Sequence, residues 1–139
     1  MKRKGTYVLF INLPRGFEGE VGSLGTVSLP PGNYCYVGSA MGGLDQRVGR
    51  HISDDKTIRW HIDRLTVTSR EKYAMEHEGT DISECDLGKI LEAAGAVPVV
   101  NGFGCSDCQC RTHLFLVEPD VAKKELASKG LTKFINKTR

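Results

Sequence analysis

The chain has 139 residues, of which 40% are hydrophobic, and a formal net charge of +2 at pH 7. This length suits a single domain, residues 1–139, with a core that needs no disulfide bonds. So small a net charge excludes any inference of nucleic-acid binding from charge alone. No apolar run has the length of a signal peptide or a membrane span, and the number of cysteines, five, is odd. We therefore expect a cytoplasmic protein with no membrane partner.

The charges are unevenly distributed along the chain. Residues 1–70 carry ten Lys and Arg against six Asp and Glu, residues 71–119 carry three against nine, and residues 120–139 carry six against two. A basic phosphate-binding surface beside an acidic segment that holds a cation would give this distribution. Scattered surface charge would give it as well, and that is the commoner cause.

The first half of the chain predicts three strands and a helix. The apolar run Tyr7–Ile11 is typical of a strand that is covered on both faces. Leu24–Leu29 and Tyr34–Val37 are two further strands, separated by the Pro30–Asn33 turn. A helix follows, from about Leu44 to Ile52.

The second half continues this mixture. Its predicted elements are a helix over Thr57–Leu65, a strand over Lys72–Glu76, a long helix over Asp81–Ala94 closed by Gly95, and a strand over Thr112–Glu118. Ile62–Thr68 could instead begin a strand. Residues 120–139 form a C-terminal helix and tail: Asp120 caps a helix to Lys129, and Leu131–Ile135 adds an edge strand or only packs down. With the early strands joined as hairpins, the pattern predicts an α+β fold, a small and mainly antiparallel β-sheet flanked by helices.

The stretch from Tyr36 to His51 is the most informative part of the sequence. A strand runs into the Gly42-Gly43 turn and then into the predicted helix, where Arg47 and His51 share one face because they are four residues apart. The helix should place these apolar residues toward the core: Leu44, Val48 and Ile52. It should leave these basic residues toward the other side: Arg47, Arg50 and His51. A guanidinium beside an imidazole predicts a phosphate-binding surface.

Two short strand motifs resemble those of the GIY-YIG nuclease superfamily. They read Gly5-Thr6-Tyr7 and Tyr36-Val37-Gly38. The Ser39-Ala40 that follows and the R-x-x-R-H ending over Arg47–His51 resemble the phage intron-encoded homing endonucleases of that superfamily. The match over this run is much more specific than a single triplet.

Two later stretches resemble one branch of the superfamily. They are Trp60-His61-Ile62-Asp63 and Gly102–Cys108. The members of this branch are small archaeal and bacterial proteins, some of them joined to DNA-repair domains. The resemblance spans roughly residues 5–118 and implies the GIY-YIG fold and a metal-dependent endonuclease.

The resemblance also implies catalytic roles for five residues. Tyr7 and Tyr36 would line the cleft and help to deprotonate the attacking water. Arg47 would hold the scissile phosphate, and His51 would assist near the leaving group or the nucleophile. Glu84 would be the carboxylate ligand of one Mg²⁺ or Mn²⁺ ion, a hard cation that prefers oxygen ligands.

Further residues next to these are candidates for substrate binding: Gly38, Ser39, Arg50, His61 and Asp63. His61 and Asp63 are the weaker pair, because a histidine beside an aromatic residue is more often packed and hydrogen-bonded than catalytic.

Each catalytic candidate also has a structural explanation. Asp81-Ile82-Ser83-Glu84 fits a capping box, with Asp81 at the N-cap and Glu84 at N3. The two tyrosines could be ordinary sheet aromatics, and Arg47 and His51 could form a solvated helix face. It is less expected that all of these structural explanations should coincide at the spacing of one family than that the residues form a single site.

The cysteines near the end of the resemblance give a second candidate site. Cys105, Cys108, Cys110 and His113 are four soft ligands that could enclose a structural Zn²⁺ ion tetrahedrally. Their spacing is not that of a standard zinc finger, and a buried turn or a redox-sensitive thiol pair remains open.

The sequence therefore predicts an endonuclease that hydrolyses phosphodiester bonds in DNA, in DNA repair or in structure-dependent cleavage. The alternative is a non-catalytic nucleic-acid-binding module that keeps the nuclease fold and acts within a repair complex with a partner protein. A small metal- or redox-responsive protein built on the cysteine cluster is the third hypothesis. The sequence does not determine the type of DNA, whether the substrate is RNA instead of DNA, or the oligomeric state.

Overall fold

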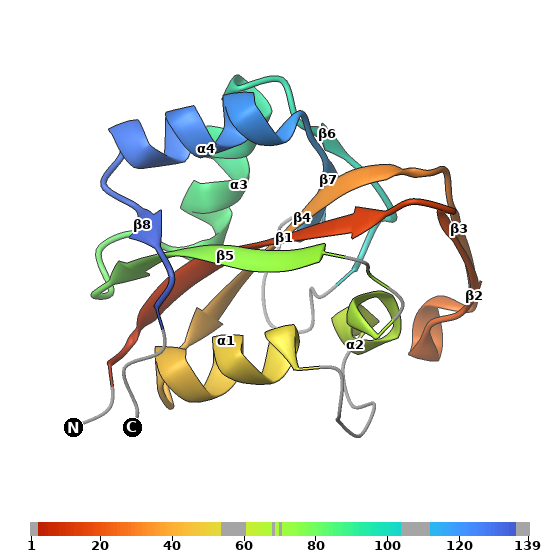
Figure 1. Ribbon diagram of the computed structural model, residues 1–139, viewed down its shortest axis with the longest axis horizontal. Coiled ribbons are helices and arrows are strands. Elements are labelled where there is room, and N and C mark those ends of the chain that lie inside the picture. Colours follow the sequence, from red (N-terminus) through yellow and green to blue (C-terminus); the bar gives the residue numbers. More distant parts are fainter. Residues whose placement is uncertain (1–2, 54–60, 68, 70, 104–111, 136–139) are drawn as a thin grey trace.

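Six β-strands form one sheet in which every pair is antiparallel, and helices pack on both faces (Figure 1). The computed structural model describes residues 3–53, 61–67, 69, 71–103 and 112–135. The order across the sheet is β6 (Val97–Pro98), β7 (Leu114–Leu116), β4 (Gly32–Ala40), β1 (Gly5–Leu13), β5 (Glu71–Glu78) and β8 (Thr132–Lys133). The α+β fold with a mainly antiparallel sheet is confirmed.

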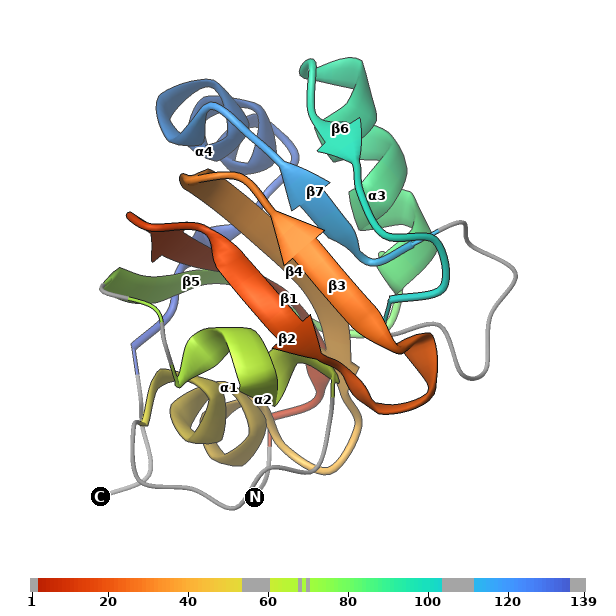
Figure 2. The ribbon, with the colours of Figure 1, turned by 90° about the vertical axis from the view of Figure 1, so that its right-hand side faces the viewer.

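The helices of the described residues cover the sheet in two layers (Figures 1 and 2). One layer holds α1 (Leu44–Ile52) and α2 (His61–Thr66), and the other holds α3 (Glu84–Ala93) and α4 (Pro119–Ser128). A smaller sheet of β2 (Phe17–Glu20) and β3 (Thr26–Leu29) lies beside them, with the short 3-10 helix η1 (Gly22–Leu24) between its strands. Within the described part of the chain, no helix combines the length and the apolar character that crossing a bilayer requires.

Strand β1 lies at the centre of the sheet, between β4 and β5. Eight of its nine residues are buried, as predicted for a strand that is covered on both faces. Its side chains alternate between two clusters: Tyr7 and Leu9 pack with residues of α1 and α2, whereas Val8 and Phe10 pack with residues of α3 and α4. β1 thus connects both hydrophobic layers.

Helix α1 is held at both ends by ion pairs with buried carboxylates. In its first turn Asp45 accepts hydrogen bonds from Nε and Nη2 of Arg3, at 3.1 and 2.6 Å, and Nη1 of the same arginine donates to Glu76 of β5 at 2.6 Å. In its last turn Arg50 donates to both oxygens of Asp63 on α2, at 2.8 and 2.9 Å. Two-pronged arginine contacts of this kind fix orientation as well as distance.

The bounds of α1 agree with the prediction, but the side assigned to His51 is wrong. Leu44 and Val48 are buried as expected. His51 is also buried, with 1% of its surface exposed, although it was predicted to lie on the other side. The histidine is three positions from Val48, so it lies at the border of the apolar stripe. Its ring turns inward because Tyr7 on β1 offers a hydrogen-bond partner there.

The start of α3 differs from the predicted capping box. The N-cap is Ser83, whose side chain accepts a hydrogen bond from the backbone N–H of Asp86 at 3.0 Å, and the Asp86 carboxylate accepts from the backbone N–H of Ser83 at 2.9 Å. Asp81 contacts His77 instead, at 2.8 Å. Glu84 therefore does not cap its own helix, and its carboxylate is available for other contacts.

Several other elements differ from the predictions. α4 is capped by Glu118, not by Asp120, with Pro119 at its first position, where a missing N–H costs nothing.

No hairpin joins β3 to β4, because β3 pairs with β2 and β4 pairs with β1. β2 and β6 are additional strands, and β7 is shorter than predicted. Of the two alternatives for Leu131–Ile135, the structure has the edge strand, β8. Residues 57–60 of the predicted helix lie outside the described residues.

The register of β1 and β4 places Tyr7 directly opposite Gly38. A Cβ atom on Gly38 would lie 2.4 Å from the Tyr7 hydroxyl oxygen and 2.5 Å from the ring carbon that bears it. The tyrosine ring therefore lies across the backbone of β4, and this approach is open only to glycine.

We expect Gly38→Ala to lower the free energy of unfolding by about 1–3 kcal/mol, since the added methyl group must displace a buried ring. Urea denaturation measures this change. Gly42→Ala is the matched control: it lies in the turn before α1, no atom is within 4 Å of its Cβ position, and it should change stability little. Equal effects of the two substitutions would refute the close packing of Tyr7 on Gly38.

Candidate functional site

The candidate site lies where β4 continues past the end of β7. β7 pairs with Tyr34–Tyr36 of β4, and the next backbone hydrogen bond runs from the N–H of Val37 to the carbonyl of His113 at 2.9 Å. Farther along β4, Ser39 is contacted by α1 from one layer and by the start of α3 from the other. Figure 2 shows these two helices on opposite sides of the sheet.

Tyr7 and His51 form the buried part of the site. The Tyr7 hydroxyl lies 2.7 Å from Nε2 of His51, and the two residues are each 1% exposed. Tyr36 packs against His51 in a T-shaped arrangement, with 6.0 Å between the ring centroids, and is partly exposed. Three of the predicted catalytic residues are thus in contact.

Ser39 connects the two remaining predicted catalytic residues. Its backbone carbonyl accepts a hydrogen bond from Nη1 of Arg47 at 3.2 Å. Its hydroxyl donates to Oε1 of Glu84 at 2.9 Å. Arg47 is partly exposed, and the Glu84 side chain is 31% exposed. A guanidinium and a carboxylate from opposite helix layers therefore meet at one residue of β4, and solvent can reach both.

His113 is a site residue that the sequence indicated only as a zinc ligand. Its Nδ1 lies 3.3 Å from Oε2 of Glu84, and its ring centroid is 6.4 Å from that of Tyr36. Its backbone is fixed on both sides, since the N–H donates to the carbonyl of Phe103 and the carbonyl accepts from Val37, each at 2.9 Å. The sequence carries no local signal of its contact with Glu84.

Burial shifts the pKa values of two of these groups in opposite directions. The pKa of Tyr7 is raised well above 10.0, first because burial disfavours the phenolate and then because Tyr36 is close, while contact with Arg47 opposes the shift. The pKa of His113 is lowered from 6.5 by burial, and the negative charge of Glu84 opposes that shift. At neutral pH Tyr7 is therefore a neutral phenol.

The predicted substrate-binding residues are arranged in different ways. Gly38 underlies the Tyr7 ring, and Ser39 bonds Glu84 as described. Asp63 is 0% exposed and pairs with Arg50, so the pair joins α2 to α1. His61 begins α2, but its side chain lies outside the described part of the chain.

A divalent cation of the Mg²⁺ or Mn²⁺ class fits the residues around Glu84. The carboxylate is partly exposed, and the Ser39 hydroxyl holds one of its oxygens in place. Within the described residues no group of three or more His, Cys, Asp or Glu side chains could enclose a metal ion. A single carboxylate suits a cation that keeps most of its water ligands until substrate binds.

Of the four predicted zinc ligands, the structure describes one, His113. Cys105, Cys108 and Cys110 lie outside the described residues, and His113 is beside Glu84.

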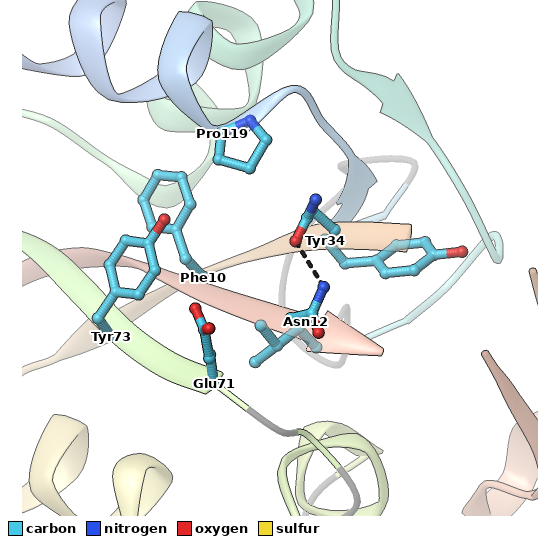
Figure 3. A pocket seen from close by; sticks show the side chains of 8 residues that line it. Phe10, Asn12, Tyr34, Glu71, Tyr73 and Pro119 are labelled. Carbon is cyan, nitrogen blue, oxygen red and sulfur yellow. Dashed lines mark hydrogen bonds between the residues drawn. The ribbon is translucent and has the colours of Figure 1, made fainter. Parts of the chain in front are cut away.

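A pocket of about 190 Å³ lies apart from this site, toward the C-terminal end of β1 (Figure 3). The stacked rings of Phe10 and Tyr73, 4.9 Å apart, form one side of it. On another side Nδ2 of Asn12 donates to Oδ1 of Asn33 at 2.9 Å. None of the predicted catalytic residues lines this pocket, so it is separate from the candidate site.

Tyr7→Phe should flatten the alkaline part of the stability profile. Because the pKa of Tyr7 is raised in the folded state, the unfolded chain loses this proton first as pH rises above about 10. Stability is then lost with rising pH, and phenylalanine removes that contribution. Urea denaturation between pH 8 and pH 11.5 compares the two slopes; parallel curves would contradict a buried hydroxyl.

Comparison with known proteins gives one match. Residues 6–135 match the family DUF123, described as a domain of unknown function. No curated protein and no solved structure matches the chain. Since the matched region contains every residue of the candidate site and covers most of the sequence, this protein belongs to the DUF123 family.

Proposed function

We propose that this protein is a metal-dependent endonuclease that hydrolyses phosphodiester bonds in DNA. The observation that carries the proposal is the meeting of Arg47 and Glu84 at Ser39. Phosphodiester hydrolysis needs positive charge on the phosphoryl oxygens and a positioned water. An arginine and a cation-binding carboxylate, both accessible to solvent and both held by one strand residue, can supply that charge.

Arg47 binds the scissile phosphate in this proposal. The side chain extends from α1 to the edge of β4, where Nη1 donates to the Ser39 carbonyl. A guanidinium can donate to two phosphate oxygens at once, whereas an ammonium group acts as a point charge. The role therefore depends on the shape of the side chain as well as on its charge.

The pair of Tyr7 and His51 accepts the proton of the attacking water. Burial raises the pKa of Tyr7, so almost no phenolate is present at neutral pH to act as the base. The Tyr7 hydroxyl instead takes a proton from water as it gives its own proton to Nε2 of His51, 2.7 Å away, so the tyrosine stays neutral. Tyr7 is 1% exposed, so this step requires Arg47 to leave its contact with the hydroxyl and move onto the phosphate.

Tyr36 has a positioning role in the same scheme. Its ring packs in a T-shaped arrangement against both imidazoles, with centroids 6.0 Å from His51 and 6.4 Å from His113. It also contacts Phe103, with 6.0 Å between the ring centroids. This partly exposed tyrosine therefore packs against both histidine rings and limits their movement.

Glu84 would hold one Mg²⁺ or Mn²⁺ ion, and when bound this ion would neutralise charge on the phosphoryl and leaving-group oxygens. The carboxylate lies in the first turn of α3, where the helix dipole favours negative charge. The hydrogen bond from Ser39 fixes its orientation relative to Arg47. The protein therefore supplies placement, and the cation supplies charge.

The setting we propose is structure-dependent cleavage in DNA repair, in the reducing cytoplasm and with a repair protein as partner. The resemblance to small proteins that are joined to DNA-repair domains supports the pathway. The odd number of cysteines supports the compartment.

Glu84→Gln and Arg47→Lys should each lower the cleavage rate by about 100-fold or more. Glu84→Gln removes the charge that binds the cation, and Arg47→Lys keeps its charge but loses the simultaneous donation to two phosphate oxygens. The assay measures cutting of labelled single-stranded, duplex, flapped and junction DNAs, and matched RNAs, with Mg²⁺ or Mn²⁺. Glu84→Gln should still bind the preferred substrate in a gel-shift assay.

The matched controls are Glu92→Gln on the exposed side of α3 and Arg64→Lys on the exposed side of α2, which should cut like the wild type. Cutting that persists in Glu84→Gln would trace the activity to another source. Binding of the panel by wild type and variants alike, with no cutting by any of them, would replace the proposal by a non-catalytic nucleic-acid-binding module.

A further inference from the structure

Glu84 faces an imidazole that the endonuclease scheme above does not use. Its Oε1 accepts the hydrogen bond from Ser39, and its Oε2 lies 3.3 Å from Nδ1 of His113. We propose that His113 and Glu84 together bind the divalent cation, and that this carboxylate and imidazole pair makes the site select Mn²⁺ over Mg²⁺. The inference extends the proposed function by naming a second ligand and the class of metal.

The distance between the two atoms suits a shared cation. An N–H···O hydrogen bond usually measures about 2.7–3.2 Å, so 3.3 Å is long for a direct one. Oxygen and nitrogen ligands lie about 2.0–2.3 Å from such an ion, so two neighbouring ligands of an octahedral ion are about 2.8–3.3 Å apart. The separation of 3.3 Å lies at the upper end of this range, so one ion can contact both atoms with little movement of either side chain.

Both side chains are held in place before any ion binds. His113 is buried, its backbone is bonded on both sides to Phe103 and Val37, and its ring lies against Tyr36. Glu84 is fixed by Ser39. Ligands that need no reordering lose little entropy when the ion binds, which favours affinity.

The donor types decide which metal is preferred. Mg²⁺ strongly favours oxygen ligands, whereas an imidazole nitrogen binds divalent transition metals, among which Mn²⁺ is the weakest binder. Replacing one water ligand by an imidazole should therefore raise the affinity for Mn²⁺ more than that for Mg²⁺. Two protein ligands also leave positions open for water and a phosphate, unlike a closed structural zinc site.

The test measures metal binding by the full-length protein without DNA. Mn²⁺ is titrated and its free concentration is read from the electron paramagnetic resonance signal, with Mg²⁺ as competitor. Pulsed measurements on the bound Mn²⁺ then detect directly coordinated ¹⁴N. We expect the wild type to bind Mn²⁺ at least about tenfold more tightly than Mg²⁺, with a clear nitrogen coupling.

His113→Asn separates a ligand from a residue that only orients Glu84. The amide can still donate a hydrogen bond to the carboxylate, but it has no imidazole nitrogen. We expect loss of the nitrogen coupling and a fall of about tenfold or more in Mn²⁺ affinity, with Mg²⁺ affinity changed much less. His77→Asn, at a histidine of β5 that contacts Asp81, is the matched control and should behave like the wild type.

Unchanged nitrogen coupling or unchanged metal selectivity in folded His113→Asn would overturn the inference. Labelling the histidines of the wild type with ¹⁵N provides the same readout without a substitution, because the ¹⁴N coupling must then be replaced by a ¹⁵N coupling. If this replacement is not seen, or if Mn²⁺ does not bind at millimolar concentration, the inference is also overturned. Cleavage is scored separately. If the protein cuts DNA but His113 does not coordinate the ion, only this inference is overturned. If Mn²⁺ binds with nitrogen coupling from His113 but the protein does not cut DNA, only the proposed nuclease function is overturned.

Discussion

The arrangement of the site depends on the direct opposition of Tyr7 and Gly38 across β1 and β4. Because Gly38 has no side chain, the tyrosine ring lies on the backbone of β4 and its hydroxyl reaches His51 on α1. A shift of one residue in β1 would turn Tyr7 toward the layer of α3 and α4. Strand pairing thus decides on which side of the sheet the hydroxyl lies, and α1 packs on that side.

A second constraint brings the two helix layers together. β7 pairs with only part of β4, so the segment after Tyr36 can be reached by side chains from both layers. The alternation along a strand directs the Ser39 hydroxyl toward α3, while its carbonyl lies in the plane of the sheet and meets Arg47. One small residue therefore joins parts of the site that are distant in sequence and on opposite faces.

The parts of this arrangement that could be predicted from the sequence are those with local signals. The bounds of α1 follow from apolar spacing after the Gly42-Gly43 turn. The burial of His51 depends on a partner 44 residues away, which no local pattern contains. The start of α3 was predicted wrongly, with Asp81 as the N-cap, because Ser83–Asp86 also fits a capping box and Asp81 contacts His77 instead. The contact of His113 with Glu84 is equally non-local, and the neighbouring cysteines made zinc the more visible hypothesis.

The two arginine–carboxylate pairs that hold α1 have a consequence for the effect of ionic strength. Arg3 with Asp45 and Arg50 with Asp63 hold the two ends of the helix, and both carboxylates are buried. Salt screens buried pairs much less than exposed charges, whereas contacts with DNA phosphates weaken steeply as salt displaces them. Under the proposed function, concentrated salt should therefore release a bound nucleic acid while α1 keeps its position. The assembled site and its occupancy by substrate thus respond differently to the same variable, and the empty site can be studied intact.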